Sequence, residues 1–205
     1  MATEATRGGF FHSAVEHHPM RTAFVAFDDM TALDFVGAFD PLTRLDTMDL
    51  APFPFEWNIC ARAETVTTTA NLQFGADSVG ESLTEYDIVV IPGGAGTRTL
   101  REDDHFLSWL RTADPDLLAS VCTGSLLLGA AGFLDGQTAT THPAATDELA
   151  AYCEVADDRV VDEGEIVTAR GVSSALDLGL YLVERLTDEE TRKTVAEQMD
   201  YPDAR

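Results

Sequence analysis

Cys122 lies between a short apolar run and a leucine-rich segment, a position that could give its sulfur a chemical role. The run 117–121 predicts a buried strand, and the residues from Gly124 onward predict a helix. A residue between a strand end and a helix start is forced into a sharp turn, where the first helical N–H groups point at its side chain. Those groups would stabilise a thiolate and lower the pKa of the thiol, which makes Cys122 a candidate nucleophile. The alternative is a small buried apolar residue, the usual role of a free cysteine.

Asp34 is a candidate partner for this cysteine. The apolar run 22–27 predicts a first strand, and a helix opening at 31–34 follows it. The carboxylate of Asp34 therefore lies near the carboxyl end of a strand, the edge at which open α/β sheets place their sites. Three residues after Thr31, it could instead complete a capping box at the start of the helix.

Gly93 and Gly94 end another apolar strand, predicted over 87–91. Glycines at this place allow close backbone approach and leave N–H groups free for an anion or a developing oxyanion. Neither the Gly-Lys-Ser/Thr of a phosphate loop nor the spacing of a dinucleotide fingerprint follows. A plain strand-to-helix turn is the alternative.

The elements that would position these residues alternate along the chain. Fully apolar runs such as 87–91 and 117–121 are typical of strands covered on both faces, as in parallel sheets. Strands alternating with helices predict an α/β fold with a doubly wound, mostly parallel sheet. We expect further strands at 56–61, 65–69, 159–161 and 165–169, and further helices at 105–112, 144–152, 173–186 and 188–199. Pro41 is expected to kink or break the first helix, whose apolar face would include Leu33, Val36, Phe39 and Leu42.

Length and charge limit the function classes. The 205 residues suit one domain, predicted over 21–205, behind an N-terminal arm over 1–20. The chain has 36 acidic and 13 basic residues, of which only Lys193 is a lysine, and its net charge is −23. Nucleic acid and anionic membranes are therefore poor partners. Acid-rich, lysine-poor surfaces resemble those of proteins from salt-accumulating halophiles, so we expect molar KCl to stabilise the protein.

The three cysteines, Cys60, Cys122 and Cys153, are too far apart for paired zinc ligands and odd in number for a disulfide framework. Cys60 and Cys153 are predicted as packing residues. His12, His17 and His18 are interpreted as part of a solvated arm rather than a metal site. The N-terminal residues lack the apolar core of a signal peptide, and no run approaches the length of a membrane span, which predicts a cytoplasmic protein.

Three motifs occur along the chain: Ile91-Pro92-Gly93-Gly94, the run from Val121 to Gly132, and Ala139-Thr140-Thr141-His142. Together they resemble the ThiJ/PfpI superfamily of class I amidotransferase-like proteins. Three further pieces are Leu33 to Gly37, Gly171 to Asp177, and Gln198-Met199-Asp200-Tyr201. With these the chain resembles, within that superfamily, the isonitrile (isocyanide) hydratases. Pro143 and the pair Ser174-Ala175 depart from the common pattern and could reshape a pocket.

The resemblance implies a flavodoxin-like fold with helices on both faces of the sheet, a cysteine nucleophile elbow, a homodimer, and no metal or organic cofactor. It places the nucleophile on Cys122, its acidic partner on Asp34, and a further active-site residue on Thr123. It also places Gly93, Gly94, His142 and Gly171 around an oxyanion or substrate pocket, with the Gly94 N–H as an anion donor and His142 as a possible base for the thiol.

The expected reaction is the addition of water to an isonitrile, a small-molecule substrate, to give an N-formamide. Cys122 would attack the terminal carbon to give a thioimidate, and Asp34 would relay protons, its pKa raised by the charge of the thiolate. One alternative is a glyoxalase or deglycase-like enzyme, or an amidase, of the same superfamily. The other is a non-catalytic redox or ligand sensor, whose cysteine would oxidise readily. Related domains begin AraC-like regulators, but no helix-turn-helix is expected after Arg205.

Overall fold

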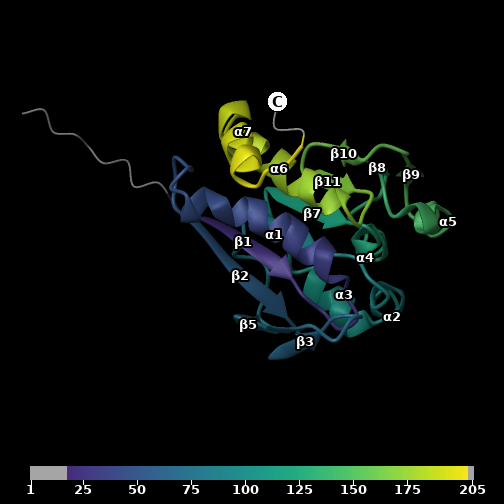
Figure 1. The fold of residues 1–205 in the computed structure, drawn as a ribbon. Coiled ribbons are helices and arrows are strands. Elements are labelled where there is room, and N and C mark those ends of the chain that lie inside the picture. The colour runs from purple at the N-terminus through teal and green to yellow at the C-terminus, as the bar shows by residue number, and fades with distance from the viewer. Residues whose placement is uncertain (1–17, 203–205) are drawn as a thin grey trace, which may run out of the picture.

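The structure is a computed structural model that describes residues 18–202. A seven-stranded sheet forms the centre of the molecule (Figure 1). Its order is β10-β11-β7-β6-β1-β2-β5, and only β10 runs antiparallel to its neighbour. Every residue of the central strands β6 and β7 is buried. The strands are β1 (Met20–Val25), β2 (Phe55–Ala61), β5 (Ser78–Val79), β6 (Ile88–Ile91), β7 (Leu117–Val121), β10 (Val160–Asp162) and β11 (Ile166–Ala169).

Helices cover both faces of this sheet (Figure 1). On one face α1 packs against α6 and α7, and on the other α4 packs against α2 and α3. Without the edge strands, the order β2-β1-β6-β7-β11 is that of a flavodoxin-like fold, which confirms the predicted fold class. The helices are α1 (Ala32–Thr47), α2 (Thr97–Leu100), α3 (Asp104–Leu110), α4 (Gly124–Ala131), α5 (Thr146–Leu149), α6 (Ser174–Leu186) and α7 (Glu189–Gln198), with the 3-10 turn η1 (Pro143–Ala145).

Two small ribbons lie outside the main sheet. An antiparallel pair joins β3 (Thr65–Thr67) to β4 (Gln73–Gly75), and a parallel pair joins β8 (Thr138–Ala139) to β9 (Glu154–Val155). The sequence did not predict β9 or α2, because these have only two and four residues and no period can be read over so short a run.

The first helix differs from the sequence-based expectation in two ways. Pro41 lies inside α1, which continues without a break to Thr47. A Cβ on Gly179 of α6 would lie 2.8 Å from Pro41 Cγ, so the proline ring packs directly against α6. Leu33 and Val36, predicted on the buried face, are 42% and 36% exposed, so the core-facing side of α1 is displaced from the predicted one.

The predicted helix over 144–152 is also wrong. Its residues form the single turns η1 and α5, because a proline at position 143 starts a 3-10 turn. The predicted N-terminal arm lies outside the described residues up to position 17, including His12 and His17, whereas Met20 already belongs to β1. His18 is exposed before the first strand.

Candidate active site

Cys122 occupies a strained turn at the carboxyl end of β7. Its φ is +55°, in the left-handed region that residues other than glycine rarely adopt. Main-chain bonds hold this conformation: the Cys122 N–H donates to the Ala169 carbonyl at 2.8 Å, and the Cys122 carbonyl accepts from Thr141 Oγ1 at 2.9 Å. Non-glycine residues in such a conformation cost about 1–3 kcal/mol and persist where the surroundings fix them, often at functional sites. The turn is therefore a nucleophile elbow.

Two glycines give the cysteine side chain its space. A Cβ on Gly171 would lie 2.5 Å from Cys122 Cβ and 2.9 Å from Cys122 Sγ. A Cβ on Gly93 would lie 2.7 Å from Cys122 Cβ and 2.9 Å from Asp34 Oδ2. All four distances are below 3.0 Å, too short for a real Cβ contact, so a side chain at either position would force Cys122 to shift.

Asp34 faces this thiol from the first turn of α1. Its side chain is fully buried, and within the described residues neither oxygen has a well-formed hydrogen bond. The loop before it is joined to the turn after β6 by the Thr31 N–H, which donates to the Gly93 carbonyl at 2.8 Å. The Thr31 side chain makes no capping bond, so the carboxylate serves the site instead of a capping box.

Burial sets the protonation state of Asp34. It raises the pKa of the carboxyl to about 6, although the nearby Cys122 thiol and Gly93 N–H favour the charged form. The upward direction was expected, but the expected cause, repulsion from a thiolate, is wrong. Near neutral pH the Asp34 carboxyl is ionised in most molecules, and a small change in its surroundings would protonate it.

The pKa of the Cys122 thiol is raised, whereas the sequence predicts that it is lowered. Burial and the adjacent negative charge of Asp34 raise it to about 12, while the N–H and hydroxyl of Thr123 oppose the shift. The resting cysteine is therefore a neutral thiol beside a carboxylate. The pair carries one negative charge and one mobile proton, so Asp34 can take the thiol proton as the sulfur attacks.

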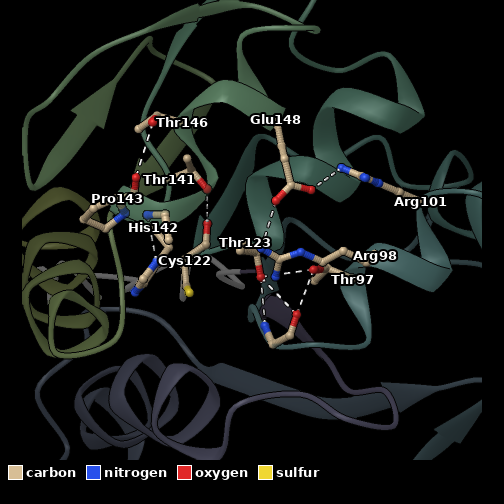
Figure 2. Close-up of polar contacts among 12 residues, drawn as sticks. Thr97, Arg98, Arg101, Cys122, Thr123, Thr141, His142, Pro143, Thr146 and Glu148 are labelled. Atoms are coloured by element: carbon tan, nitrogen blue, oxygen red, sulfur yellow. Dashed lines mark hydrogen bonds and ion pairs between the residues drawn. The ribbon is translucent and has the colours of Figure 1, made fainter.

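Thr123 joins the elbow to the glycine turn after β6 (Figure 2). Its hydroxyl accepts from the Gly94 N–H at 2.9 Å and lies 3.1 Å from Thr97 Oγ1. Because Thr123 already occupies the Gly94 N–H, the expected role of that group as an anion donor is not supported. Gly94 instead orients Thr123, and Thr97 is a buried member of this network that sequence reasoning missed.

His142 follows Thr141 at the start of η1. Its Nδ1 accepts from the Ala144 N–H at 3.1 Å, which leaves Nε2 to carry the proton of the neutral ring. Within residues 18–202 no hydrogen bond joins this imidazole to the Cys122 thiol. The described contacts therefore relate the Cys122 thiol to Asp34 and not to His142.

A double ion pair fastens the segment that carries His142 to α2 (Figure 2). Arg98 Nη2 lies 3.0 Å from Glu148 Oε1, and Arg101 Nη1 lies 2.6 Å from Glu148 Oε2. Burial alone would raise the pKa of Glu148, but the two guanidinium groups hold it below its ordinary value. No local sequence pattern indicates this contact, because it joins segments about fifty residues apart in the chain.

Within residues 18–202, no three His, Cys, Asp or Glu side chains are grouped so that they could hold a metal ion. The same part of the chain contains no helix long and apolar enough to cross a membrane.

Comparison with known proteins identifies this arrangement. The model of the DJ-1/PfpI family matches residues 20–185, which include all elements of the site. The chain belongs to the DJ-1/PfpI family. Isonitrile hydratase of Pseudomonas putida is 33% identical over 195 residues, which are 90% of this chain and 80% of the relative. Protein DJ-1alpha of Drosophila melanogaster is 32% identical over 146 residues, 68% of this chain and 64% of the relative.

Solved structures of DJ-1/PfpI proteins share the fold. A ThiJ/PfpI family protein from Pseudomonas syringae superimposes with a TM-score of 0.81 and 26% identity, over 98% of this chain and 82% of that one. DJ-1beta of Drosophila melanogaster superimposes with a TM-score of 0.76 and 22% identity, over 89% of this chain and 98% of that one. The family includes enzymes as well as DJ-1 proteins, so the reaction of this member must be argued from its site.

Proposed function

We propose that this protein is a cysteine-dependent hydratase that adds water to isonitriles and releases N-formamides. The observation that carries the proposal is the fully buried carboxyl of Asp34 facing the Cys122 thiol, with a pKa of about 6. A carboxyl of that pKa changes protonation easily at neutral pH, so one group can both accept and return a proton.

The first step forms a thioimidate. The Cys122 thiol gives its proton to the Asp34 carboxylate as the sulfur bonds to the terminal carbon of R–N≡C. Asp34 then returns this proton to the same carbon, which gives R–N=CH–S–Cys122. No proton is gained or lost overall, and Thr123 favours the developing charge on sulfur because its N–H and hydroxyl lower the pKa of the thiol.

The second step hydrolyses the thioimidate. Asp34, again a carboxylate, takes a proton from water as the oxygen bonds to the carbon. Asp34 gives this proton to the nitrogen. The hydroxyl proton of the intermediate then passes through Asp34 to the sulfur as the carbon–sulfur bond breaks, and the product is R–NH–CHO. The enzyme returns to a neutral thiol beside a carboxylate, which is its resting state.

Similarity supports this reaction over others. Isonitrile hydratase of Pseudomonas putida matches nearly the whole chain, and its identity of 33% is moderate. Matches to DJ-1 proteins keep open the glyoxalase or deglycase-like alternative, since that chemistry also begins with thiol attack on an electrophilic carbon. An amidase that uses His142 as base is less favoured, because the Nδ1 of that ring is engaged by Ala144.

A redox or ligand sensor is the non-enzyme alternative. One relative, the HTH-type transcriptional regulator CdhR of Pseudomonas aeruginosa, is 27% identical over 184 residues, 85% of this chain and 53% of the regulator. A redox sensor needs a readily formed thiolate. The pKa of about 12 at Cys122 opposes this, whereas a neighbouring base satisfies the needs of catalysis.

We further propose that the enzyme acts as a cytoplasmic, salt-adapted homodimer. Leu33 and Val36 flank the position of Asp34 on α1, and with Leu72 they are exposed large apolar side chains. Apolar groups so close to the catalytic carboxyl would be covered by a second copy of the chain. The net charge of −23 favours a medium that screens self-repulsion.

An assay of substrate conversion tests the proposal. The protein and its Cys122→Ala and Cys153→Ala variants are incubated in KCl with an aryl isonitrile and, separately, with methylglyoxal. We expect N-formamide from the wild type and from Cys153→Ala, whose cysteine lies away from the elbow, and none from Cys122→Ala. Lactate without formamide would assign the glyoxalase reaction instead. No turnover, together with ready oxidation of Cys122 to a sulfinic acid, would assign a sensor.

A further inference from the structure

A cavity of about 240 Å³ opens at the loops that follow β1, β2 and β6. The apolar side chains of Phe27, Val66 and Phe106 line it, and Asp34, Cys122 and Thr123 are not among its lining residues. In this sheet the strand order reverses between β1 and β6, because the chain passes from β1 outward to β2 and then back to β6. Open α/β sheets bind ligands outside the carboxyl ends of strands at such a switch point.

Two opposite charges face this cavity without pairing with each other. Within the described residues, the Asp29 carboxylate accepts no hydrogen bond, and Arg62 makes a single bond, from Nη1 to the His105 carbonyl at 2.9 Å. The third charged residue, Asp28, already accepts from the Thr67 N–H at 2.7 Å. Asp29 and Arg62 therefore offer one free acceptor and several free donors at the rim of an apolar pocket.

The unpaired state of Arg62 is unusual for this chain. With 36 acidic and 13 basic residues, most arginines have a carboxylate within reach, and eight of the described arginines form ion pairs. Arg111, the other described arginine without one, donates to two carbonyl groups at the end of α4. Arg62 donates to only one carbonyl, that of His105, although two aspartates line the same cavity.

We propose that this cavity binds a free α-amino acid with an apolar side chain. The guanidinium of Arg62 would receive the α-carboxylate, which it can bind through two parallel N–H groups. The carboxylate of Asp29 would receive the α-ammonium group, and the apolar side chain would lie against Phe27, Val66 and Phe106. The volume is below the roughly 300–1,000 Å³ typical of sites for larger ligands, which suits one amino acid.

This site is separate from Asp34 and Cys122, but it borders the glycine turn after β6. The Asp29 carbonyl accepts from the Gly96 N–H at 3.2 Å, and the next residue, Met30, forms a bridge with Gly94. The proposal does not depend on the isonitrile reaction, because the binding groups take no part in it.

Isothermal titration calorimetry tests the proposal with L-leucine, L-phenylalanine and L-methionine as probes. N-acetyl-L-leucine, which lacks the ammonium group, and leucinol, which lacks the carboxylate, are the matched ligands. We expect at least one probe to bind at millimolar concentration or tighter, and both altered ligands to bind at least about tenfold more weakly. Absence of heat with all three probes, or equal binding of the altered ligands, would overturn the proposal.

Paired variants locate the binding groups. Asp29→Asn and Arg62→Met should each weaken binding of the same probe at least about tenfold. Asp49→Asn is the control for the first, because Asp49 is also exposed and has a φ of +56° against +60° for Asp29. Arg111→Met is the control for the second, since it removes a guanidinium that donates to carbonyl groups elsewhere. Both controls should bind as the wild type does.

Cys122→Ala separates this proposal from the catalytic one. Binding of the probe should be unchanged in that variant even if it abolishes turnover. Loss of binding in Cys122→Ala, or retention in both Asp29→Asn and Arg62→Met, would show that the amino acid binds elsewhere, and the proposal would fail.

Discussion

The buried carboxyl of Asp34 and the thiol of Cys122 share one negative charge and one mobile proton. Asp34 has a pKa of about 6 and Cys122 a pKa of about 12, and each group shifts the other. Their order means that the carboxylate, and not the thiolate, is the resting anion. Catalysis then depends on proton transfer to Asp34 during attack rather than on a thiolate formed in advance.

Activity should follow the ionisation of Asp34. Because the resting carboxylate must accept the thiol proton, kcat/KM should rise with pH through about 6 and level off above it. Asp34→Asn cannot accept that proton and should lose about 10²–10⁴-fold in kcat/KM. The measurement is a pH profile of formamide production. A profile that instead rises near pH 9, as for an isolated thiol, would contradict the role of Asp34.

The raised pKa of Asp34 should make the free energy of unfolding depend on pH. An unfolded aspartate has a pKa near 4 and the buried one about 6, so the folded state holds the extra proton between these values. Stability contributed by the protonated form is therefore lost as pH rises from 4 to 6, about 3 kcal/mol in all. Denaturant unfolding should show Asp34→Asn gaining stability over the wild type across this range. A difference that does not vary with pH would rule out the raised pKa.

Gly171 should tolerate no side chain. Its φ is +113°, and a Cβ there would overlap Cys122 Cβ and Sγ. Gly164→Ala is the matched control, because Gly164 has a φ of +90° with nothing near its Cβ position, and should cost about 1–2 kcal/mol of unfolding free energy. Gly171→Ala should cost roughly a further 1–3 kcal/mol and abolish turnover. Equal losses in the two variants would show that the contact with Cys122 is unimportant.

Glu148 should influence activity from a distance. Glu148→Gln leaves two guanidinium groups on α2 without their carboxylate, and should cost about 1 kcal/mol of stability. Because α5 directly follows the turn at His142, the variant should also raise KM. Glu85→Gln removes an exposed pair with Arg21 and is the control, expected to change neither quantity. An unchanged KM in Glu148→Gln would mean that the ion pairs support the fold alone.

Salt should stabilise the protein. A net charge of −23 repels itself at low ionic strength, and counterions screen this repulsion. The melting temperature should rise as KCl is raised from about 0.1 to about 3 M, because the Debye length shortens as the ionic strength increases. A melting temperature that is constant or falls over this range would contradict salt adaptation.

The sequence could predict the sheet and the meeting of Asp34 with Cys122. Long apolar runs identify the central strands, and parallel strands bring their carboxyl ends to one edge, which places the residues that follow them together. Periodicity alone does not show which side of α1 faces the core, and the prediction that Leu33 and Val36 lie on the buried face is wrong.

The properties that depend on tertiary burial were beyond the sequence. The thiol pKa was predicted to fall because Cys122 precedes a helix, but burial and the charge of Asp34 outweigh that effect. No local sequence pattern predicts the contact of Gly171 with Cys122 or the ion pairs of Glu148, because each joins segments far apart in the chain.

Cys122 is proposed to form a covalent thioimidate, with the proton relayed by Asp34. Rapid-quench mass spectrometry of the intact protein with an aryl isonitrile can detect this species. We predict a transient adduct on Cys122 whose added mass equals that of the whole isonitrile, because the thiol proton moves to the carbon. The adduct should be absent in Cys122→Ala and form more slowly in Asp34→Asn. Formamide production at the wild-type rate by Cys122→Ala, with no adduct at any time, would show that catalysis does not pass through Cys122.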